Sequence, residues 1–360
     1  MKQTNGKGAY PDWMLRKLVQ GRAIQGVRSR DQIQPASLDL SLSSELYRLE
    51  TIVVPYPGEE IRSIFSFLGA RDHDMGNVLE CNVAYLARCN ERLNLPASVY
   101  GYCNPKSSVG RTDVQVRVIA DGVSRFDSLP EKGFKGGLWV VIISKSHPIL
   151  VKPDLCFTQL RLFNADTRLN ETEMEIEFDL NGFLRRPSGK RLSYKRDIKI
   201  KDGDGSILMT LDLKPGKGIV AGWECRGSNR ALDLSSTKGS VQRGNYFQPL
   251  RVENDRVLLE KGKFYILGTH EVLHVPQNFA AEVAPMDDRC GEFRSHYAGF
   301  ADPGFEGILT LEVRPYEDIT FRHGQPVARV KFERMCELPE KPYCGNYQFQ
   351  PGPRLSKLFI

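Results

Sequence analysis

Residues 79–99, LECNVAYLARCNERLNLPASV, recur in a related form as residues 259–279, LEKGKFYILGTHEVLHVPQNF. Tyr85 matches Tyr265 and Pro96 matches Pro276, in each case 180 positions apart. A second pair of stretches, residues 133–136 (GFKG) and 304–307 (GFEG), matches at an offset of 171. Two matches in the same order along the chain indicate an internal duplication.

The segments around these repeats are mostly predicted to be β-strands. Short runs rich in β-branched and aromatic residues alternate with Gly, Pro, Asp and Asn, which is the pattern of strands and turns. The runs are residues 138–143, 149–151, 155–163, 308–313 and 327–332. Residues 173–180 alternate apolar and acidic side chains and also favour a strand, whereas Pro11 and Asp12 predict the start of an early helix.

The linking stretch between the repeats, residues 165–205, is charged and rich in turn residues. We therefore expect two β-rich domains, each a barrel or double-sheet fold, spanning residues 1–200 and 201–360. With 41% hydrophobic residues among 360, the chain can bury one or two cores.

The charge and cysteine content exclude several classes of protein. A net charge of +6 suits a phosphate-bearing ligand but is too small to predict nucleic-acid binding. Neither a membrane-spanning run nor a secretory signal is present, so we expect a cytoplasmic protein that does not contact a membrane. The eight cysteines form no C-x-x-C pair, which predicts reduced thiols and argues against a structural zinc site.

Residues 270–274, HEVLH, satisfy the H-E-x-x-H pattern of zinc proteases. That pattern binds zinc only on a helix, where the two histidines share one face. The flanking residues 264–267 and Val275 instead predict a strand, on which the two histidines would lie about 13 Å apart. We therefore do not interpret these residues as a protease centre.

Residues 106–111, KSSVGR, combine two cations, two hydroxyls and a glycine, which suits a triphosphate. On composition alone, a polar turn between strands explains them more simply. In the second copy, residues 289–294 keep cations but lack both serines. Conversely, Glu312 lies in an apolar strand of the second copy, where the first has Val141. Burial would suit this carboxylate for acid–base chemistry, although an exposed edge strand is an equally good explanation.

Four segments resemble the dCTP deaminases, members of the trimeric dUTPase superfamily. Residues 33–40 (IQPASLDL) are similar to their Q-P-A-S-x-D-L signature, and residues 106–111 to their R-S-S-x-x-R motif. Residues 301–305 (ADPGF) with Glu312 resemble the D-P-G-[FW] block that is followed by L-E, and residues 343–356 resemble the tail that closes over the nucleotide. The resemblance implies two tandem dUTPase-like distorted β-barrel or jelly-roll domains with a few short helices.

The resemblance also implies an activity: deamination of dCTP to dUTP and ammonia, without zinc and with Mg²⁺ on the triphosphate. Glu312 would be the general base, while Ser107 and Arg111 would position the attacking water. Substrate contacts would come from Lys106, Ser108, Asp302, Thr310, Leu311, Tyr343, Asn346, Tyr347 and Gln350. A homotrimer and dTTP as a feedback ligand are further expectations from the family.

Neither copy carries the whole set of motifs, since the first lacks the glutamate and the second lacks the serines. One complete site forms if residues 106–111 face Glu312, and the reciprocal site, with Val141, would be inactive. Two alternatives stay open. One is a dUTPase or a bifunctional enzyme that releases dUMP and pyrophosphate, and the other is a non-catalytic nucleotide-binding regulator.

Overall fold

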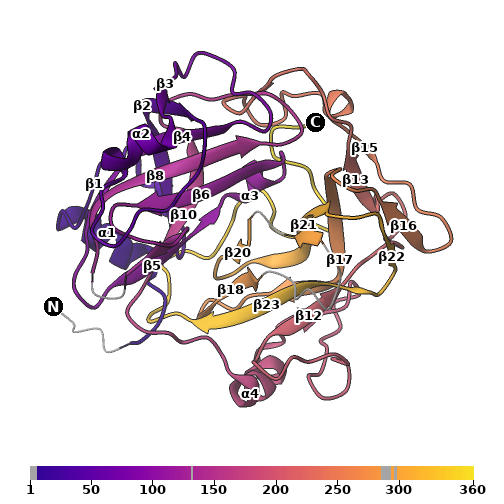
Figure 1. Cartoon of the computed structure of the whole chain (residues 1–360). Helices are drawn as coiled ribbons and strands as arrows, with labels where there is room; N and C mark the ends of the chain where they lie inside the picture. Colours follow the sequence, from indigo (N-terminus) through magenta and orange to yellow (C-terminus); the bar gives the residue numbers. More distant parts are fainter. Residues whose placement is uncertain (1–5, 131–132, 285–292, 296–297) are drawn as a thin grey trace.

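A computed structural model describes residues 6–130, 133–284, 293–295 and 298–360 (Figure 1). Its helices are short. They are α1 (Asp12–Gln20), α2 (Phe65–Leu68), α3 (Ser107–Gly110) and α4 (Glu171–Asn181), with 3-10 turns η1 (Arg30–Gln32), η2 (Ile61–Ile64) and η3 (Arg243–Asn245). Among the described residues, none of these helices has the length and apolar character that crossing a bilayer would require.

The first half of the chain forms one large antiparallel sheet with the path β6-β8-β4-β2-β10-β5-β7, to which β1 and β3 add at β4 and β2. Its strands are β1 (Ile24–Gln25), β2 (Leu38–Leu49), β3 (Arg71–Asp72), β4 (Ala84–Asn94), β5 (Tyr100–Pro105), β6 (Val114–Ala120), β7 (Ser128–Leu129), β8 (Lys135–Ser144) and β10 (Cys156–Phe163). The short strand β9 (Ile149–Leu150) pairs in parallel with β14 of the second half.

The second half forms a sheet in the order β15-β13-β17-β21-β19, joined by β11 at β17, and a second sheet in the order β12-β23-β18-β20. Strands β16 and β22 form a separate pair. The bounds are β11 (Leu184–Arg185), β12 (Ile207–Thr210), β13 (Gly222–Cys225), β14 (Leu232–Asp233), β15 (Phe247–Pro249), β16 (Arg256–Leu259), β17 (Tyr265–His274), β18 (Phe279–Ala284), β19 (Phe293–Ser295), β20 (Phe300–Ala301), β21 (Glu306–Pro315), β22 (Ile319–Arg322) and β23 (Pro326–Arg334).

The duplication is visible in strand register. In the first half Leu86 of β4 pairs with Val141 of β8, and in the second half Ile266 of β17 pairs with Glu312 of β21. Both strand pairs also carry a register shift at the same repeat position, between residues 88 and 92 and between residues 268 and 272. The two halves therefore use one pairing scheme, and residues can be compared between them position by position.

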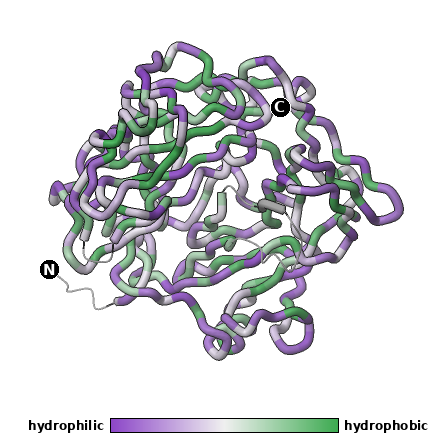
Figure 2. The backbone as a smooth tube through the Cα atoms, viewed as in Figure 1, coloured by the Kyte–Doolittle hydropathy of each residue, from purple (hydrophilic) through white to green (hydrophobic). Residues whose placement is uncertain are grey.

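Strand β8 is buried on both faces, which its continuous apolar sequence explains. Leu138, Val140 and Ile142 enter the core of the first half. Trp139 and Val141 point to the opposite face and pack under the apolar side chains of residues 61–68. Figure 2 shows the same contrast along the chain, with apolar strands inside and polar connections outside.

The predicted fold class, mainly β with a few short helices, is confirmed, and so are the five predicted strands and the early helix α1. The prediction of a strand at residues 173–180 is wrong, because these residues belong to α4. Asn170 and Glu173 form a capping box, and Met174 and Phe178 share one buried helix face. The division at residue 200 stays a prediction; residues 169–198 supply buried side chains to the core of the second half.

Candidate active site

A cavity of about 320 Å³ lies where the two halves meet. Its volume is within the range of small-molecule sites, about 300–1,000 Å³. The first half lines it with Asp31, Gln34, Asp39, Lys106, Ser107, Ser108, Arg111 and Gln159. The second half contributes Val283, Ala298, Phe300, Ala301, Asp302, Phe305, Leu309, Thr310, Tyr343, Gly345, Asn346, Tyr347, Gln350 and Lys357.

The Lys106–Arg111 segment leaves β5 and forms the single turn of α3, so the expected polar turn is a short helix. Lys106, Ser107 and Ser108 all line the cavity, and the ammonium of Lys106 bonds to the carboxylate of Asp39. The main-chain carbonyl of Ser108 accepts a hydrogen bond of 2.7 Å from the Ser356 hydroxyl. The segment therefore presents cations and hydroxyls to one wall of the cavity and is tied to the C-terminal tail.

Arg111 is 4% exposed and is held by the same tail. Its Nη1 atom donates to the carbonyl of Arg354 at 2.8 Å and to the Oε1 atom of Gln350 at 3.4 Å. The guanidinium stacks 3.6 Å from the ring centre of Tyr347. Within the described part of the chain its Nε atom has no hydrogen-bond partner. Arg111 lines the cavity, and this buried donor is not used by the described residues of the protein.

A second cation, Lys357, lines the same cavity. Burial lowers the pKa of the Lys357 ammonium, and the nearby charge of Lys106 lowers it further. Burial raises the pKa of Asp39, against the opposing effect of Lys106. An anionic ligand between the two lysines would stabilise their charged forms. The electrostatics of this wall thus favour a phosphate-bearing ligand.

Asp302 lies in the D-P-G turn before β21, at the junction of the halves. Its Oδ1 atom accepts a hydrogen bond of 3.2 Å from the backbone N–H of Ala36, inside the Q-P-A-S segment of the first half. Burial raises the pKa of the Asp302 carboxyl to about 7, with the Ala36 hydrogen bond opposing the shift. The contact brings two of the motifs together across the duplication.

Strand β21 places alternate side chains on opposite faces. Thr310 lines the cavity, and Glu312 lies on the same face and is 1% exposed. The Oε2 atom of Glu312 accepts a hydrogen bond of 3.3 Å from the backbone N–H of Ala298, which itself lines the cavity. The carboxylate is therefore buried behind the cavity wall, and the alternative of an exposed edge strand is wrong.

Leu311 corrects one expectation from the sequence. It does not line the cavity and is fully buried in the core of the second half. Leu309 lines the cavity instead.

The equivalent face of the first half is closed by apolar packing. Trp139 and Val141 occupy the repeat positions of Thr310 and Glu312, as the matched register shows. They pack against Ile61 and Leu68 from the η2–α2 segment. A polar ligand has no place on this face, which explains physically why the first copy tolerates valine instead of glutamate.

The C-terminal tail crosses from the second half to the first (Figure 1), and several of its residues line the cavity. Gln350 is 2% exposed, and its Nε2 atom donates to the carbonyl of Ile308 at 2.6 Å and to the Thr310 hydroxyl at 3.1 Å. Tyr343, Asn346 and Tyr347 line the cavity. The tail ends with Leu355 and Leu358 buried in the core of the first half.

The sequence missed several lining residues. Lys357, Gln159, Asp31 and Gln34 were not singled out as candidates, although Gln34 and Asp39 belong to the Q-P-A-S segment. A lysine at the end of the tail carries no local pattern that would identify it. Residues 289–292 of the matching second-copy segment lie outside the described residues. The comparison of residues 289–294 with residues 106–111 therefore rests on sequence.

The two histidines of the H-E-x-x-H pattern lie on strand β17, as predicted, and face different carboxylates. The Nδ1 atom of His274 lies 3.0 Å from Glu306, whereas the Nδ1 atom of His270 lies 4.0 Å from Asp212. The described cysteines are all free thiols.

Two family models together cover most of the chain. Residues 6–166 match the 2'-deoxycytidine 5'-triphosphate deaminase N-terminal domain, and residues 185–359 match the C-terminal domain of the same family. The matched ranges contain every motif described above.

Individual proteins agree with these matches. A protein of Methanosphaera stadtmanae named "dCTP deaminase, dUMP-forming" is 32% identical over 124 residues, 32% of this chain and 63% of that protein. One of Leifsonia xyli subsp. xyli with the same name is 30% identical over 118 residues, covering 30% and 59%. The chain thus spans about three fifths of the length of these relatives. A crystal structure of 2'-deoxycytidine 5'-triphosphate deaminase from Agrobacterium tumefaciens superposes with a TM-score of 0.84 and 31% identity, covering 93% of this chain and 98% of that one.

Proposed function

The chain belongs to the 2'-deoxycytidine 5'-triphosphate deaminase family, and on that basis we propose that it hydrolyses dCTP at C4, releasing ammonia. One observation carries the proposal. A single cavity combines Lys106–Arg111 of the first half with Asp302 and Thr310 of the second, and Glu312 lies behind its wall. Each half supplies what the other lacks.

Glu312 is proposed as the general base. It would take a proton from the water that attacks C4, and would then deliver protons to the ring nitrogen and the departing amine. Its burial beside Ala298, which lines the cavity, supports this role. Ser107 and Arg111 would orient the water, and the Nε atom of Arg111, which has no partner among the described residues, would be one donor for it.

Lys106, Ser108 and Lys357 are proposed to bind the triphosphate, and Asp302 to contact the sugar. Tyr343, Asn346, Tyr347 and Gln350 would hold the tail closed over the nucleotide. Thr310 would line the base pocket together with Leu309, which takes the place expected for Leu311. Cations and hydroxyls gathered along one wall match the chemistry of phosphate oxygens.

Metal ions have a limited part in this proposal. Mg²⁺ would enter as part of the substrate, bound to the triphosphate. Neither a histidine nor a cysteine occurs among the described residues that line the cavity, so this wall lacks the ligands that zinc prefers. We therefore propose that the attacking water is activated by Glu312 without zinc.

A second candidate reaction is further cleavage to dUMP and pyrophosphate in the same cavity. The names of the relatives from Methanosphaera and Leifsonia, both "dUMP-forming", favour it. The homotrimer and the dTTP feedback ligand stay predictions.

Product analysis tests the proposal. The full chain is incubated with dCTP and Mg²⁺, and ammonia, dUTP, dUMP and pyrophosphate are measured together. Ammonia in equal amount to dUTP supports deamination alone, and ammonia with equal amounts of dUMP and pyrophosphate supports both steps. Nucleotide binding without any ammonia would contradict deamination and favour a regulator.

A further inference from the structure

We propose that Asp212, His270 and His323 form a binding site for a divalent transition metal, with Zn²⁺ as the ion that fits best. The three residues come from separate segments: Asp212 follows β12, His270 lies on β17, and His323 follows β22. One potential ligand atom from each lies within 4.8 Å of the other two. This site is separate from the cavity and is not needed for the proposed reaction.

The geometry is close to that of a bound ion. The Oδ2 atom of Asp212 lies 4.0 Å from the Nδ1 atom of His270, and its Oδ1 atom lies 3.5 Å from the Nδ1 atom of His323. Two ligands at ~2.1 Å from one ion are separated by at most ~4.2 Å. Small side-chain rotations therefore bring the trio together. A metal on His323 Nδ1 would replace the 3.2 Å hydrogen bond from the backbone N–H of Leu213.

One ligand atom of this trio has no hydrogen-bond partner among the described residues. The Nδ1 atom of His270 is buried and has no hydrogen-bond partner among the described residues. Among the described residues Asp212 forms ion pairs with the two histidines alone, and its Oδ1 atom also accepts a hydrogen bond of 2.8 Å from the backbone N–H of Lys214. Two imidazoles and a carboxylate are a ligand set that Zn²⁺ accepts, with water in the fourth position.

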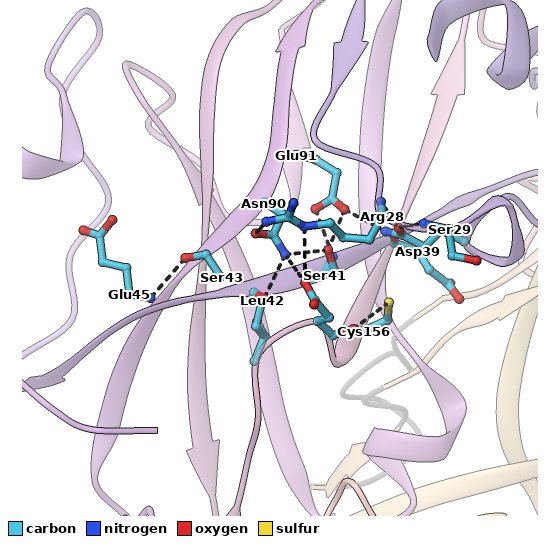
Figure 3. A network of polar contacts seen from close by, with 12 residues as sticks. Arg28, Ser29, Asp39, Ser41, Leu42, Ser43, Glu45, Asn90, Glu91 and Cys156 are labelled. Carbon is cyan, nitrogen blue, oxygen red and sulfur yellow. Dashed lines mark hydrogen bonds and ion pairs between the residues drawn. The ribbon is translucent and has the colours of Figure 1, made fainter. Parts of the chain in front are cut away.

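The first half provides an internal comparison. The register shift of β4, between residues 88 and 92, corresponds to the one of β17 that contains His270, and the Arg28 side chain lies beside it (Figure 3). Asn90 holds the repeat position of His270, and its Nδ2 atom bonds to Asp154 at 2.9 Å and to the carbonyl of Leu42 at 2.9 Å. The guanidinium of Arg28 then contacts Asn90 at 2.9 Å and Asp154 at 3.3 Å. The Asn90 amide, the Asp154 carboxylate and the Arg28 guanidinium are therefore all paired with one another.

The backbone around the two bulges is otherwise equivalent. The N–H of Asp154 bonds to the carbonyl of Leu42, as that of Gly324 does to Leu211. These contacts make His323 the counterpart of Pro153. The same contacts align Gly324 with Asp154 and Asp212 with Ser43, so the second half has a carboxylate and two imidazoles where the first half has a serine, an asparagine and a proline. A metal ion would supply a positive charge between Asp212 and the two imidazoles, in the region where the first half places the Arg28 guanidinium.

The expected consequence is stabilisation of the second half, not catalysis. Thr269, next to His270, accepts a hydrogen bond of 2.9 Å from the N–H of Leu309. The site thus joins three segments next to the β17–β21 pair, and β21 supplies Leu309 and Thr310 to the cavity. This differs from the sequence expectation of no zinc, which rested on cysteine spacing and on the reacting carbon.

The test uses full-length protein without a histidine tag, stripped with a chelator and titrated with Zn²⁺ by calorimetry. We expect one equivalent to bind and to raise the melting temperature, while millimolar Mg²⁺ has no such effect. His270→Asn, which installs the first-copy residue, and His323→Gln should each weaken Zn²⁺ binding at least ~10–100-fold, the loss caused even by changes to residues that merely orient ligands. His274→Asn is the matched control and should bind Zn²⁺ normally.

Co²⁺ substitution in the unmutated protein keeps the test decisive if a variant fails to fold. The visible spectrum should show nitrogen and oxygen ligands without a cobalt–thiolate band. Absence of stoichiometric binding, a thiolate band, or unchanged affinity in both His270→Asn and His323→Gln would overturn the proposal. Equal loss in His274→Asn would do so as well.

Discussion

At the scale of single residues, the contrast between Val141 and Glu312 explains how one fold came to carry one site. Both occupy the same register position, yet the apolar side chains of residues 61–68 cover the valine and a cavity wall covers the glutamate. The sequence identified this asymmetry because the repeat can be aligned without a structure. It also identified Lys106, Ser107, Ser108 and Arg111, whose residue types suit a triphosphate.

Replacing Glu312 with glutamine tests its proposed role as base. The change keeps side-chain size but removes the proton acceptor, so deamination should fall by ~10²–10⁴-fold while nucleotide binding persists. Steady-state ammonia release and equilibrium binding of dCTP measure the two effects. Turnover close to that of the unmutated protein would exclude Glu312 as the base.

Asp302 predicts a pH dependence of stability. Burial raises its pKa to about 7, whereas the unfolded chain titrates near the ordinary value of ~4. The folded state therefore retains the proton longer, and this group lowers the free energy of unfolding as pH rises from ~4 to ~7. Asp302→Asn removes the effect. Between pH 5 and pH 8 the variant should gain about 2–3 kcal/mol relative to the unmutated protein in urea unfolding. Parallel pH profiles would contradict the assignment.

At the scale of elements, hydrophobic patterning was sufficient for strands but not for α4. Residues 173–180 have period-two alternation, and the capping box at Asn170 outweighs it. The position of Lys357 was beyond sequence reasoning for another reason. Its place at the cavity depends on the path of the whole tail, which is set by contacts with both halves.

The tail gives a prediction at this scale. Gln350→Ala removes the buried bonds to Ile308 and Thr310 and the contact with Arg111. Losing buried hydrogen bonds costs about 1–3 kcal/mol, so KM for dCTP should rise roughly 10- to 100-fold with a smaller change in kcat. Gln242→Ala, an exposed glutamine at η3, is the control. An unchanged KM would mean that Gln350 does not hold the tail over the substrate.

At the scale of the whole molecule, the halves are joined through their interiors. The core of the first half includes Phe264, Ile266, Leu355 and Leu358 of the second. The duplication could be predicted from the sequence because the repeats are local patterns. The contribution of second-half residues to the core of the first half could not be predicted. Packing between distant segments leaves no periodic signal.

Arg161 tests this junction. It is 1% exposed, belongs to β10, and pairs with Glu333 and Glu282 of the second half. Arg161→Met would leave Glu333 buried without its partner, and unfolding free energy should fall by about 3–5 kcal/mol. Arg71→Ala, which breaks an exposed pair with Glu50, should cost no more than ~1 kcal/mol. Equal losses in urea unfolding would show that the buried pair adds nothing.

The account rests centrally on one catalytic site built from both repeats, and a double-mutant cycle of Ser107→Ala and Glu312→Gln measures this directly. Ammonia release is determined for both single variants and the double variant, with Cys290→Ala, aligned with Ser107 in the second copy, as a control that should stay near normal. Residues that act as a unit are non-additive, so the double variant should lose about as much kcat/KM as the worse single variant. A loss equal to the product of the two single losses, or an equal loss in Cys290→Ala, would contradict a shared site.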